Sequence, residues 1–144
     1  MADWTTQLVV KNTTKQDLLL SDRYVYPKNR VDSFPEIIRA GKTATFKVVS
    51  PSGKPYGPEF WIKLVADSPV GHESLGSIYF HVDIPYGRHI NELVVRANNE
   101  LAFKLNPSEL KNGAHDYFGE LTIGLLNDTK EPTNEKWTEE LIIE

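Results

Sequence analysis

The sequence predicts an all-β protein, folded as a single-domain antiparallel β-sandwich of about ten short strands with minimal helix. Apolar and polar residues alternate along most segments, and turn-forming residues separate these segments at short intervals. Only Pro107–Lys111 has a helical pattern, and it is little more than one turn long. Because 144 residues without a linker are expected to form one unit, the domain spans residues 1–144.

The alternation is clearest in the middle of the chain. In Ile78–Ile84 the even-numbered residues are apolar, whereas Tyr79, His81 and Asp83 lie on the opposite face. The same period of two recurs in four further segments: Thr43–Val48, Phe60–Val65, Leu101–Leu105 and Leu121–Leu125. A period of two predicts strands with one face on a core and the other face wetter.

Proline, glycine and asparagine mark the turns between these strands. Pro51–Pro58 holds three prolines and two glycines and cannot continue a strand ladder. Asn12–Gln16, between Leu8–Val10 and Leu18–Leu20, predicts a hairpin. Further turns are predicted at Ser68–Gly71, Pro85–Gly87, Ala97–Asn99 and Asn112–Gly113. Asp22–Pro35 is expected to be a long loop or a bent strand, Asn127–Glu135 a polar connection, and Trp137–Glu144 a final strand.

Composition and charge exclude several classes of protein. The chain has no cysteine, no apolar run that approaches the ~20 residues of a spanning helix, and a net charge of −4, which argues against nucleic-acid binding. Residues 1–72 carry a net charge of +3 and residues 73–144 carry −7, unless the two halves interleave in space and the asymmetry averages out. Met1–Trp4 lacks a signal-peptide pattern, so we expect synthesis in the cytoplasm, then release and action on the surface of target cells.

Signals of an enzyme are few, so we expect no catalytic residues and no cofactor. The chain contains no nucleophile elbow, no glycine-rich phosphate loop and no zinc-binding histidine motif. His81 and Asp83 share one strand face and could hold a metal together with His89, although a hydrogen-bonded surface pair is the preferred interpretation. A hydrolase using His81 or His89 is the weakest functional hypothesis.

Aromatic residues are placed unusually. Six lie in or beside predicted loops: Tyr24, Tyr26, Tyr56, Tyr86, Tyr117 and Trp137. Trp61 and Tyr79 lie on the strand face opposite the core. Rings with a polar handle suit a membrane interface or a sugar, and they can enclose a choline-type cation; alternatively, individual rings pack back over the ends of the sandwich.

Several short motifs, in order over residues 4–126, resemble the aegerolysin family. The segment Asp83–Gly87 is similar to that family's D-x-P-aromatic-G turn, and it follows an aromatic-rich strand. The other matching segments are Gln7–Asn12 after Trp4, Ile37–Lys42, Glu59–Ile62 and Gly119–Ile123. Within that family the chain looks closer to the small aegerolysin-like components of bacterial binary insecticidal toxins than to many fungal members, and its turn more distantly resembles a region of the actinoporins.

The resemblance implies a toxin component that binds membrane lipid, in membranes containing sphingolipid or sterol, and acts with a larger perforin-like (MACPF) protein that forms the cytolytic pore. We expect Tyr56 and Tyr86, with Trp61 or Tyr79, to enter the headgroup layer, and Tyr86 to contact choline or ethanolamine. Arg88 would pair with the lipid phosphate. Asp83 would receive an ammonium or hydroxyl group, or fix the turn through an Asx bond. The alternative function is a carbohydrate-binding lectin with the same fold.

Overall fold

A computed structural model describes residues 3–66, 75–87, 90–126 and 141–143. Within them the chain forms eleven strands and no helix. The strands are β1 (Trp4–Asn12), β2 (Leu18–Val25), β3 (Arg30–Ser33), β4 (Ile37–Ile38), β5 (Thr43–Ser50), β6 (Glu59–Ala66), β7 (Ser77–Asp83), β8 (Glu92–Ala97), β9 (Leu101–Asn106), β10 (Tyr117–Leu125) and β11 (Leu141–Ile143). The predicted all-β class and the strand number are confirmed.

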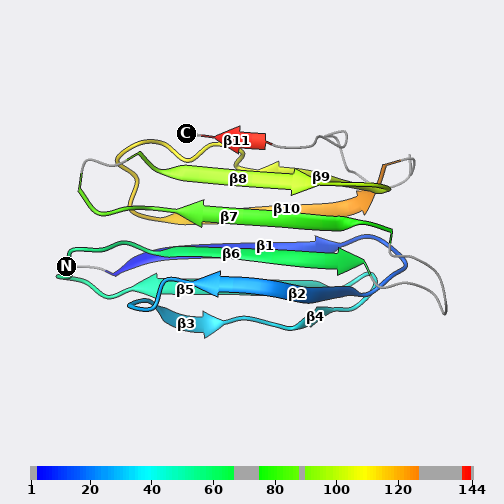
Figure 1. The fold of residues 1–144 in the computed structure, drawn as a ribbon, viewed down its shortest axis with the longest axis horizontal. Coiled ribbons are helices and arrows are strands. Elements are labelled where there is room, and N and C mark those ends of the chain that lie inside the picture. The colour runs from blue at the N-terminus through cyan, green and yellow to red at the C-terminus, as the bar shows by residue number, and fades with distance from the viewer. Residues whose placement is uncertain (1–2, 67–74, 88–89, 127–140, 144) are drawn as a thin grey trace.

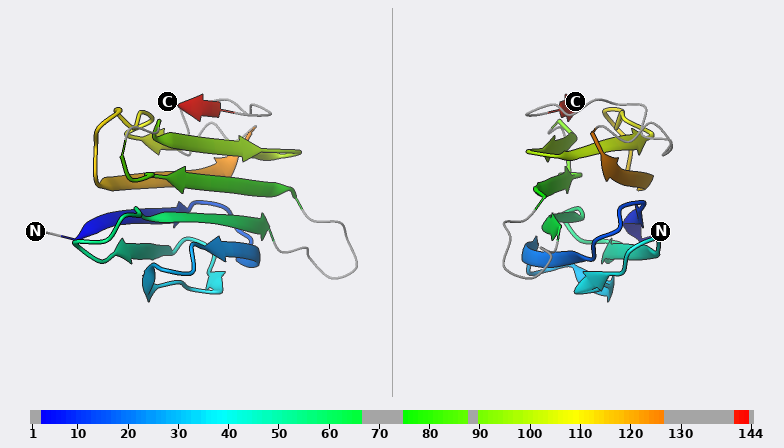
Figure 2. Two further views of the ribbon diagram at one scale, coloured as in Figure 1. Left: turned by 60° about the vertical axis from the view of Figure 1, so that its left-hand side comes forward. Right: turned by 90° about the vertical axis from the view of Figure 1, so that its right-hand side faces the viewer.

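The strands form two sheets that pack face to face (Figures 1 and 2). One sheet has the order β3-β5-β1-β10-β9, and the other has the order β11-β8-β7-β6-β2-β4. Every pairing is antiparallel except that of β1 with β10, which run parallel. The predicted sandwich is therefore confirmed, with one parallel pair at the centre of the five-stranded sheet.

The core lies between the sheets and consists of the apolar faces that the alternation predicts. Phe46, Phe60, Phe80 and Phe103 are completely buried there, one on each of four strands. Around them pack leucine, isoleucine and valine side chains from the same inward-facing positions. Burial of this apolar surface is the main favourable term in folding, and it fixes the register, since a one-residue slip would turn every side chain to the other face.

The two halves of the chain lie side by side. Strands β1 to β6 occupy one side of both sheets and β7 to β11 occupy the other, so a seam runs between β6 and β7 in one sheet and between β1 and β10 in the other (Figure 1). The strands of the basic and acidic halves therefore do not interleave. The two halves meet along this seam, and the candidate site lies at one end of it.

The predicted hairpin between Leu8–Val10 and Leu18–Leu20 is wrong. β1 pairs with β5 and β10, whereas β2 belongs to the other sheet. The intervening segment crosses between the sheets, and the buried Asn12 side chain holds this crossing together. Its amide donates to the carbonyl oxygens of Gln16 (2.7 Å) and Ile38 (3.0 Å), and its Oδ1 accepts from the Thr14 hydroxyl. The turn-forming residues correctly indicated where the chain reverses direction. They did not indicate which sheet the following strand joins.

Three further expectations can be compared with the structure. Of the two alternatives for Asp22–Pro35, the structure favours the bent strand over the long loop, because this segment contains the end of β2, which has a bulge between Leu20 and Asp22, and all of β3. Pro107–Lys111 forms no helix. The first strand begins at Trp4, not after it. The predicted turn Ser68–Gly71, the connection Asn127–Glu135 and most of Trp137–Glu144 lie outside the described residues, which include only β11 from the last of these segments.

Candidate functional site

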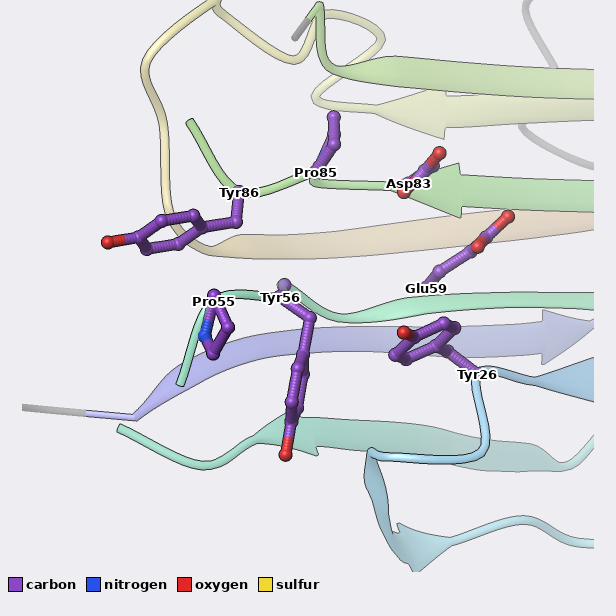
Figure 3. A pocket seen from close by; sticks show the side chains of 8 residues that line it. Tyr26, Pro55, Tyr56, Glu59, Asp83, Pro85 and Tyr86 are labelled. Carbon is purple, nitrogen blue, oxygen red and sulfur yellow. The ribbon is translucent and has the colours of Figure 1, made fainter. Parts of the chain in front are cut away.

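A cleft of about 280 Å³ opens at the end of the sandwich where β6 begins and β7 ends. We call it the tyrosine cleft, and it is lined by Tyr26, Pro55, Tyr56, Gly57, Glu59, Asp83, Pro85 and Tyr86. Figure 3 shows that its three tyrosines come from three different segments, with Glu59 and Asp83 on neighbouring strands. Three of the six residues predicted to form the site, Tyr56, Asp83 and Tyr86, therefore meet here.

Backbone hydrogen bonds fix the walls of the cleft. Glu59 stands opposite Asp83 in the register of β6 and β7. The Ile84 N–H donates to the Pro58 carbonyl oxygen (3.0 Å), and the Tyr26 N–H donates to that of Glu59 (3.0 Å). The Asn29 side chain donates to the Gly57 carbonyl (3.2 Å) and accepts from the Glu59 N–H (2.9 Å). The segment that carries Tyr56 is therefore held from both neighbouring strands.

Gly57 is required where two stretches of backbone approach each other. A Cβ atom at this position would overlap the carbonyl oxygen of Ile84 and lie 3.3 Å from the Trp4 ring. Only a residue without a side chain permits so close an approach. The glycine in this proline-rich segment therefore brings Pro55 and Tyr56 against the turn that carries Pro85 and Tyr86.

The aromatic rings of the cleft pack against neighbouring rings, and one of them, Tyr86, is also half exposed to solvent. The Tyr26 and Tyr56 rings lie with centroids 5.6 Å apart at an interplanar angle of 51°. Tyr86 is 50% exposed, and its ring stacks on Trp4 at 5.8 Å, which in turn stacks on His115 at 4.0 Å. Aromatic surface is therefore exposed at Tyr86, whereas Tyr56 is partly buried against Tyr26, and Trp4 and His115, which were not predicted as site residues, stack beside Tyr86.

Two carboxyl groups give the cleft its electrostatic character. Glu59 accepts a hydrogen bond at Oε2 from Nε2 of His81 (2.9 Å), and Asp83 lines the opposite wall. The charge of Glu59 also acts on Tyr24 on the neighbouring strand β2. The pKa of the Tyr24 hydroxyl is raised, first by partial burial and next by the charge of Glu59, because both disfavour the phenolate. The described lining residues include no basic side chain.

Trp61 and Tyr79 do not line the cleft. They lie on the outer face of the six-stranded sheet in a row that we call the aromatic ladder: Tyr24, Trp61 and Tyr79 on the adjacent strands β2, β6 and β7. Successive ring centroids are 6.3 Å and 5.7 Å apart, and the guanidinium of Arg96 covers the Tyr79 ring at 4.2 Å. Trp61 or Tyr79 as a further membrane-contacting residue therefore stays a prediction, and neither ring lines the cleft together with Tyr56 and Tyr86.

Two other predicted residues have different outcomes. Tyr117 is buried in the core within β10, and its hydroxyl donates to the Pro107 carbonyl (3.0 Å), so it is no candidate for membrane contact. Burial raises the pKa of this hydroxyl far above its usual value. Arg88, proposed to contact phosphate, lies outside the described residues.

The site residues predicted from the sequence include neither Tyr26, which was noted only among the aromatic residues beside loops, nor Glu59. Glu59 had a signal, because Gly71, in a predicted turn, stands halfway in sequence between Glu59 and Asp83. A hairpin centred on that turn would place the two carboxylates opposite each other. Tyr26 had no such signal, since its position depends on how β2 pairs with β6 across the Asn12 crossing.

Metal binding and membrane spanning find no support in the part of the chain that the structure describes. No group of three histidine, aspartate or glutamate side chains there could hold a metal ion. His89, the third ligand considered from the sequence, is not among those residues, and His81 hydrogen-bonds to Glu59. No helix long and apolar enough to cross a membrane occurs in the same residues.

Comparison with known proteins gives matches in structure only. Neither family models nor curated protein sequences match this chain. The crystal structure of the lipid-binding protein Nakanori is similar with a TM-score of 0.60 and 10% identity, over 86% of this chain and 72% of that one. IP-1A from Alcaligenes faecalis is similar with a TM-score of 0.56 and 16% identity, over 83% and 89% of the two chains.

RahU, crystallised in complex with a Tris molecule, is similar with a TM-score of 0.55 and 9% identity, over 85% of this chain and 97% of that one. All three are aegerolysin-family proteins, which is the family that the sequence motifs resemble. At these identities the likeness concerns the fold. The chain therefore has the β-sandwich fold of the aegerolysins.

Proposed function

We propose that the protein binds the ammonium-bearing headgroup of a membrane lipid in the tyrosine cleft. The observation that carries the proposal is the meeting of two carboxyl groups, Glu59 and Asp83, with three tyrosine rings in one open cleft. Carboxylates attract a cation by charge, and the faces of tyrosine rings attract it through their quadrupole. Choline and ethanolamine are the membrane headgroups that carry such a cation.

The size of the cleft supports a headgroup as its ligand. Its volume of about 280 Å³ lies just below the range of roughly 300–1,000 Å³ that is usual for sites of drug-sized molecules. The cleft is open at the end of the sandwich, where Tyr86 is half exposed and stacks on Trp4. Tyrosine and tryptophan are favoured at the level of lipid headgroups. These two rings would therefore add affinity for membranes in general, while the cleft selects the headgroup.

The described fold supports binding at the surface of a membrane. Such binding requires only that side chains enter the interface. Nakanori, which has a similar fold, is described as a lipid-binding protein. We accordingly assign the end of the sandwich with Trp4, Tyr56 and Tyr86 to the membrane side, with Arg88 proposed to contact the lipid phosphate.

A wider role as a toxin component rests on the sequence resemblance. In this part of the proposal the protein is released from the cell that makes it, docks on a target membrane and recruits a larger perforin-like partner that forms the pore, with insects as the target. The protein alone should then bind vesicles without releasing an entrapped dye. Dye release by the protein alone would contradict the need for a partner.

Cosedimentation with vesicles tests lipid binding. The panel comprises phosphatidylcholine, phosphatidylethanolamine and sphingomyelin, each with and without cholesterol, and phosphatidylglycerol as the head without an ammonium group. We expect retention by at least one ammonium lipid and a loss of about tenfold in affinity for Tyr86→Ala, because stacking and cation–π contacts are worth about 1–2 kcal/mol. Because Tyr86 is half exposed, the melting temperature of the Tyr86→Ala variant should stay within a few degrees of that of the wild-type protein.

Two outcomes would contradict this function. Retention by none of the vesicles would exclude a lipid headgroup, and equal retention by phosphatidylglycerol would exclude recognition of the ammonium. Micromolar binding to a glycan array, unaffected by added lipid, would instead favour the alternative function of a carbohydrate-binding lectin.

A further inference from the structure

His81 lies behind the tyrosine cleft and contacts it through one residue. Its Nε2 is 2.9 Å from Oε2 of Glu59, and both side chains are largely buried, at 19% and 24% exposure. His81 does not itself line the cleft, whereas Glu59 does. Glu59 therefore connects the space where a ligand would bind to an imidazole on the outer face of the sheet.

The charge of the imidazole decides what Glu59 offers to a cation. A neutral His81 donates its Nε2–H to the carboxylate and holds it in place while leaving its negative charge intact. A protonated His81 neutralises that charge as an ion pair and adds a positive charge beside the cleft. Histidine is the side chain whose charge ordinarily changes between about pH 5 and 8.

Other charged groups near His81 lie on the three strands of the same sheet face. In the register of β6, β7 and β8, His81 stands opposite Trp61 and Val94, with the Tyr79 ring at 6.3 Å. The titratable or charged residues that flank it on this face are Glu59, Lys63, Tyr79, Asp83, Glu92 and Arg96. Of these groups, Arg96 lies over the Tyr79 ring. Within the described residues, the charged group that is hydrogen-bonded to His81 is Glu59.

We infer that His81 is a positioning residue for Glu59 and makes binding of an ammonium headgroup dependent on pH, strong when the imidazole is neutral and weak when it is charged. The inference rests on the proposed function and names a specificity-determining residue behind the cleft. By linkage, a bound ammonium group must in turn disfavour protonation of His81. Acidification therefore releases the headgroup.

The experiment measures binding to phosphatidylcholine or sphingomyelin vesicles, whichever the wild-type protein retains, from about pH 8 to about pH 5.5, the range over which histidine titrates. The quaternary ammonium of these lipids keeps its charge across the range, so changes come from the protein. We expect wild-type affinity to fall by roughly three- to tenfold on acidification, the effect of one added charge near a partly exposed site. Melting temperatures at each pH separate loss of binding from loss of fold.

His81→Gln supplies an amide donor to Glu59 that never becomes charged. We expect it to bind about two- to threefold more weakly than wild type near pH 8, because the amide positions the carboxylate less well, and to have a flat pH profile. The matched control is His115→Gln, which removes the exposed histidine stacked on Trp4 at the same end of the molecule. This variant should keep the wild-type pH slope.

Failure of this inference differs from failure of the proposed function. A flat wild-type profile, or a slope that survives in His81→Gln, would overturn the role of His81 while leaving lipid binding intact. A slope lost only in His115→Gln would transfer the effect to the Trp4 stack and would also overturn it. Absence of wild-type binding at every pH would instead remove the proposed function itself.

Discussion

The tyrosine cleft and the aromatic ladder contain the same kinds of residue but are built differently. In the ladder, Tyr24, Trp61 and Tyr79 come from adjacent strands and stack on one another, so their rings are each other's partners. In the cleft, Tyr26, Tyr56 and Tyr86 come from three segments and leave a hollow bordered by two carboxyl groups. The number of aromatic residues is therefore a poor guide to a binding site. What matters is whether the rings fill the space between them.

This comparison gives opposite expectations for the two regions. Changes in the ladder should alter the stability of the fold, because its contacts are satisfied within the protein. Changes to the exposed side chains of the cleft, such as Tyr86→Ala, should alter ligand binding with little effect on stability.

The largest expected effect comes from the core beneath both regions. Phe80 is completely buried on the inner face of β7 and contacts the rings of Phe60 and Tyr117. Phe80→Ala should lower the free energy of unfolding by about 3–5 kcal/mol, because it leaves a cavity in a packed core. Urea denaturation measures this change. A loss below about 1 kcal/mol would mean that the core does not pack as described.

The next effect separates the cleft from the rest of the fold. Gly57→Ala would press a methyl group into the Ile84 carbonyl and move the Tyr56 wall away from the Tyr86 wall. We expect vesicle binding to fall by more than about tenfold and stability to fall by about 1–3 kcal/mol, as is usual for overpacking.

The matched control for this variant is Gly53→Ala. Gly53 also lies in the proline-rich segment, at φ +75°, but it has open space around it. Gly53→Ala should cost about 1 kcal/mol from backbone strain alone and should retain binding. If both variants lose binding equally, close approach at Gly57 is not what forms the cleft.

The smallest expected effect comes from the ladder. Trp61→Ala removes two ring contacts on the outer sheet face, at 6.3 Å and 5.7 Å. It should destabilise the fold by about 1–3 kcal/mol, since each aromatic pair contributes about 0.5–1.5 kcal/mol. Vesicle binding by the folded protein should change less than for Tyr86→Ala. A loss of binding as large as that of Tyr86→Ala, without loss of stability, would mean that Trp61 contacts the lipid.

Local patterns were sufficient to predict most strands, although the one pairing predicted from them, between Leu8–Val10 and Leu18–Leu20, is wrong. The hairpins β6–β7 and β9–β10 pair symmetrically about Gly71 and Gly113, both in turns predicted from the sequence. The period of two also identified which faces form the core, as Phe60 and Phe80 illustrate. These features are local, because each involves one strand or two strands that follow each other in the sequence.

Contacts between distant segments were not predictable from such patterns. The parallel pairing of β1 with β10 joins Val10 to Leu121, far apart in sequence. The move of β2 to the second sheet depends on the buried Asn12 amide, and it carries Tyr26 into the cleft. The alternation of apolar and polar residues correctly predicted that Trp61 and Tyr79 point away from the core. Their distance from the cleft follows from their position along the strands, which becomes clear only once the register is known.

The most direct test of a headgroup site in the tyrosine cleft is an NMR titration of the protein with soluble phosphocholine and phosphoethanolamine, observing the assigned aromatic ring signals. Binding in the cleft should shift the signals of Tyr26, Tyr56 and Tyr86, leave those of Tyr24 and Tyr79 in place, and give no shifts with glycerol phosphate at the same concentration. Shifts centred on the aromatic ladder, or shifts of the cleft tyrosines that are equal with glycerol phosphate, would contradict recognition of the ammonium group in this cleft.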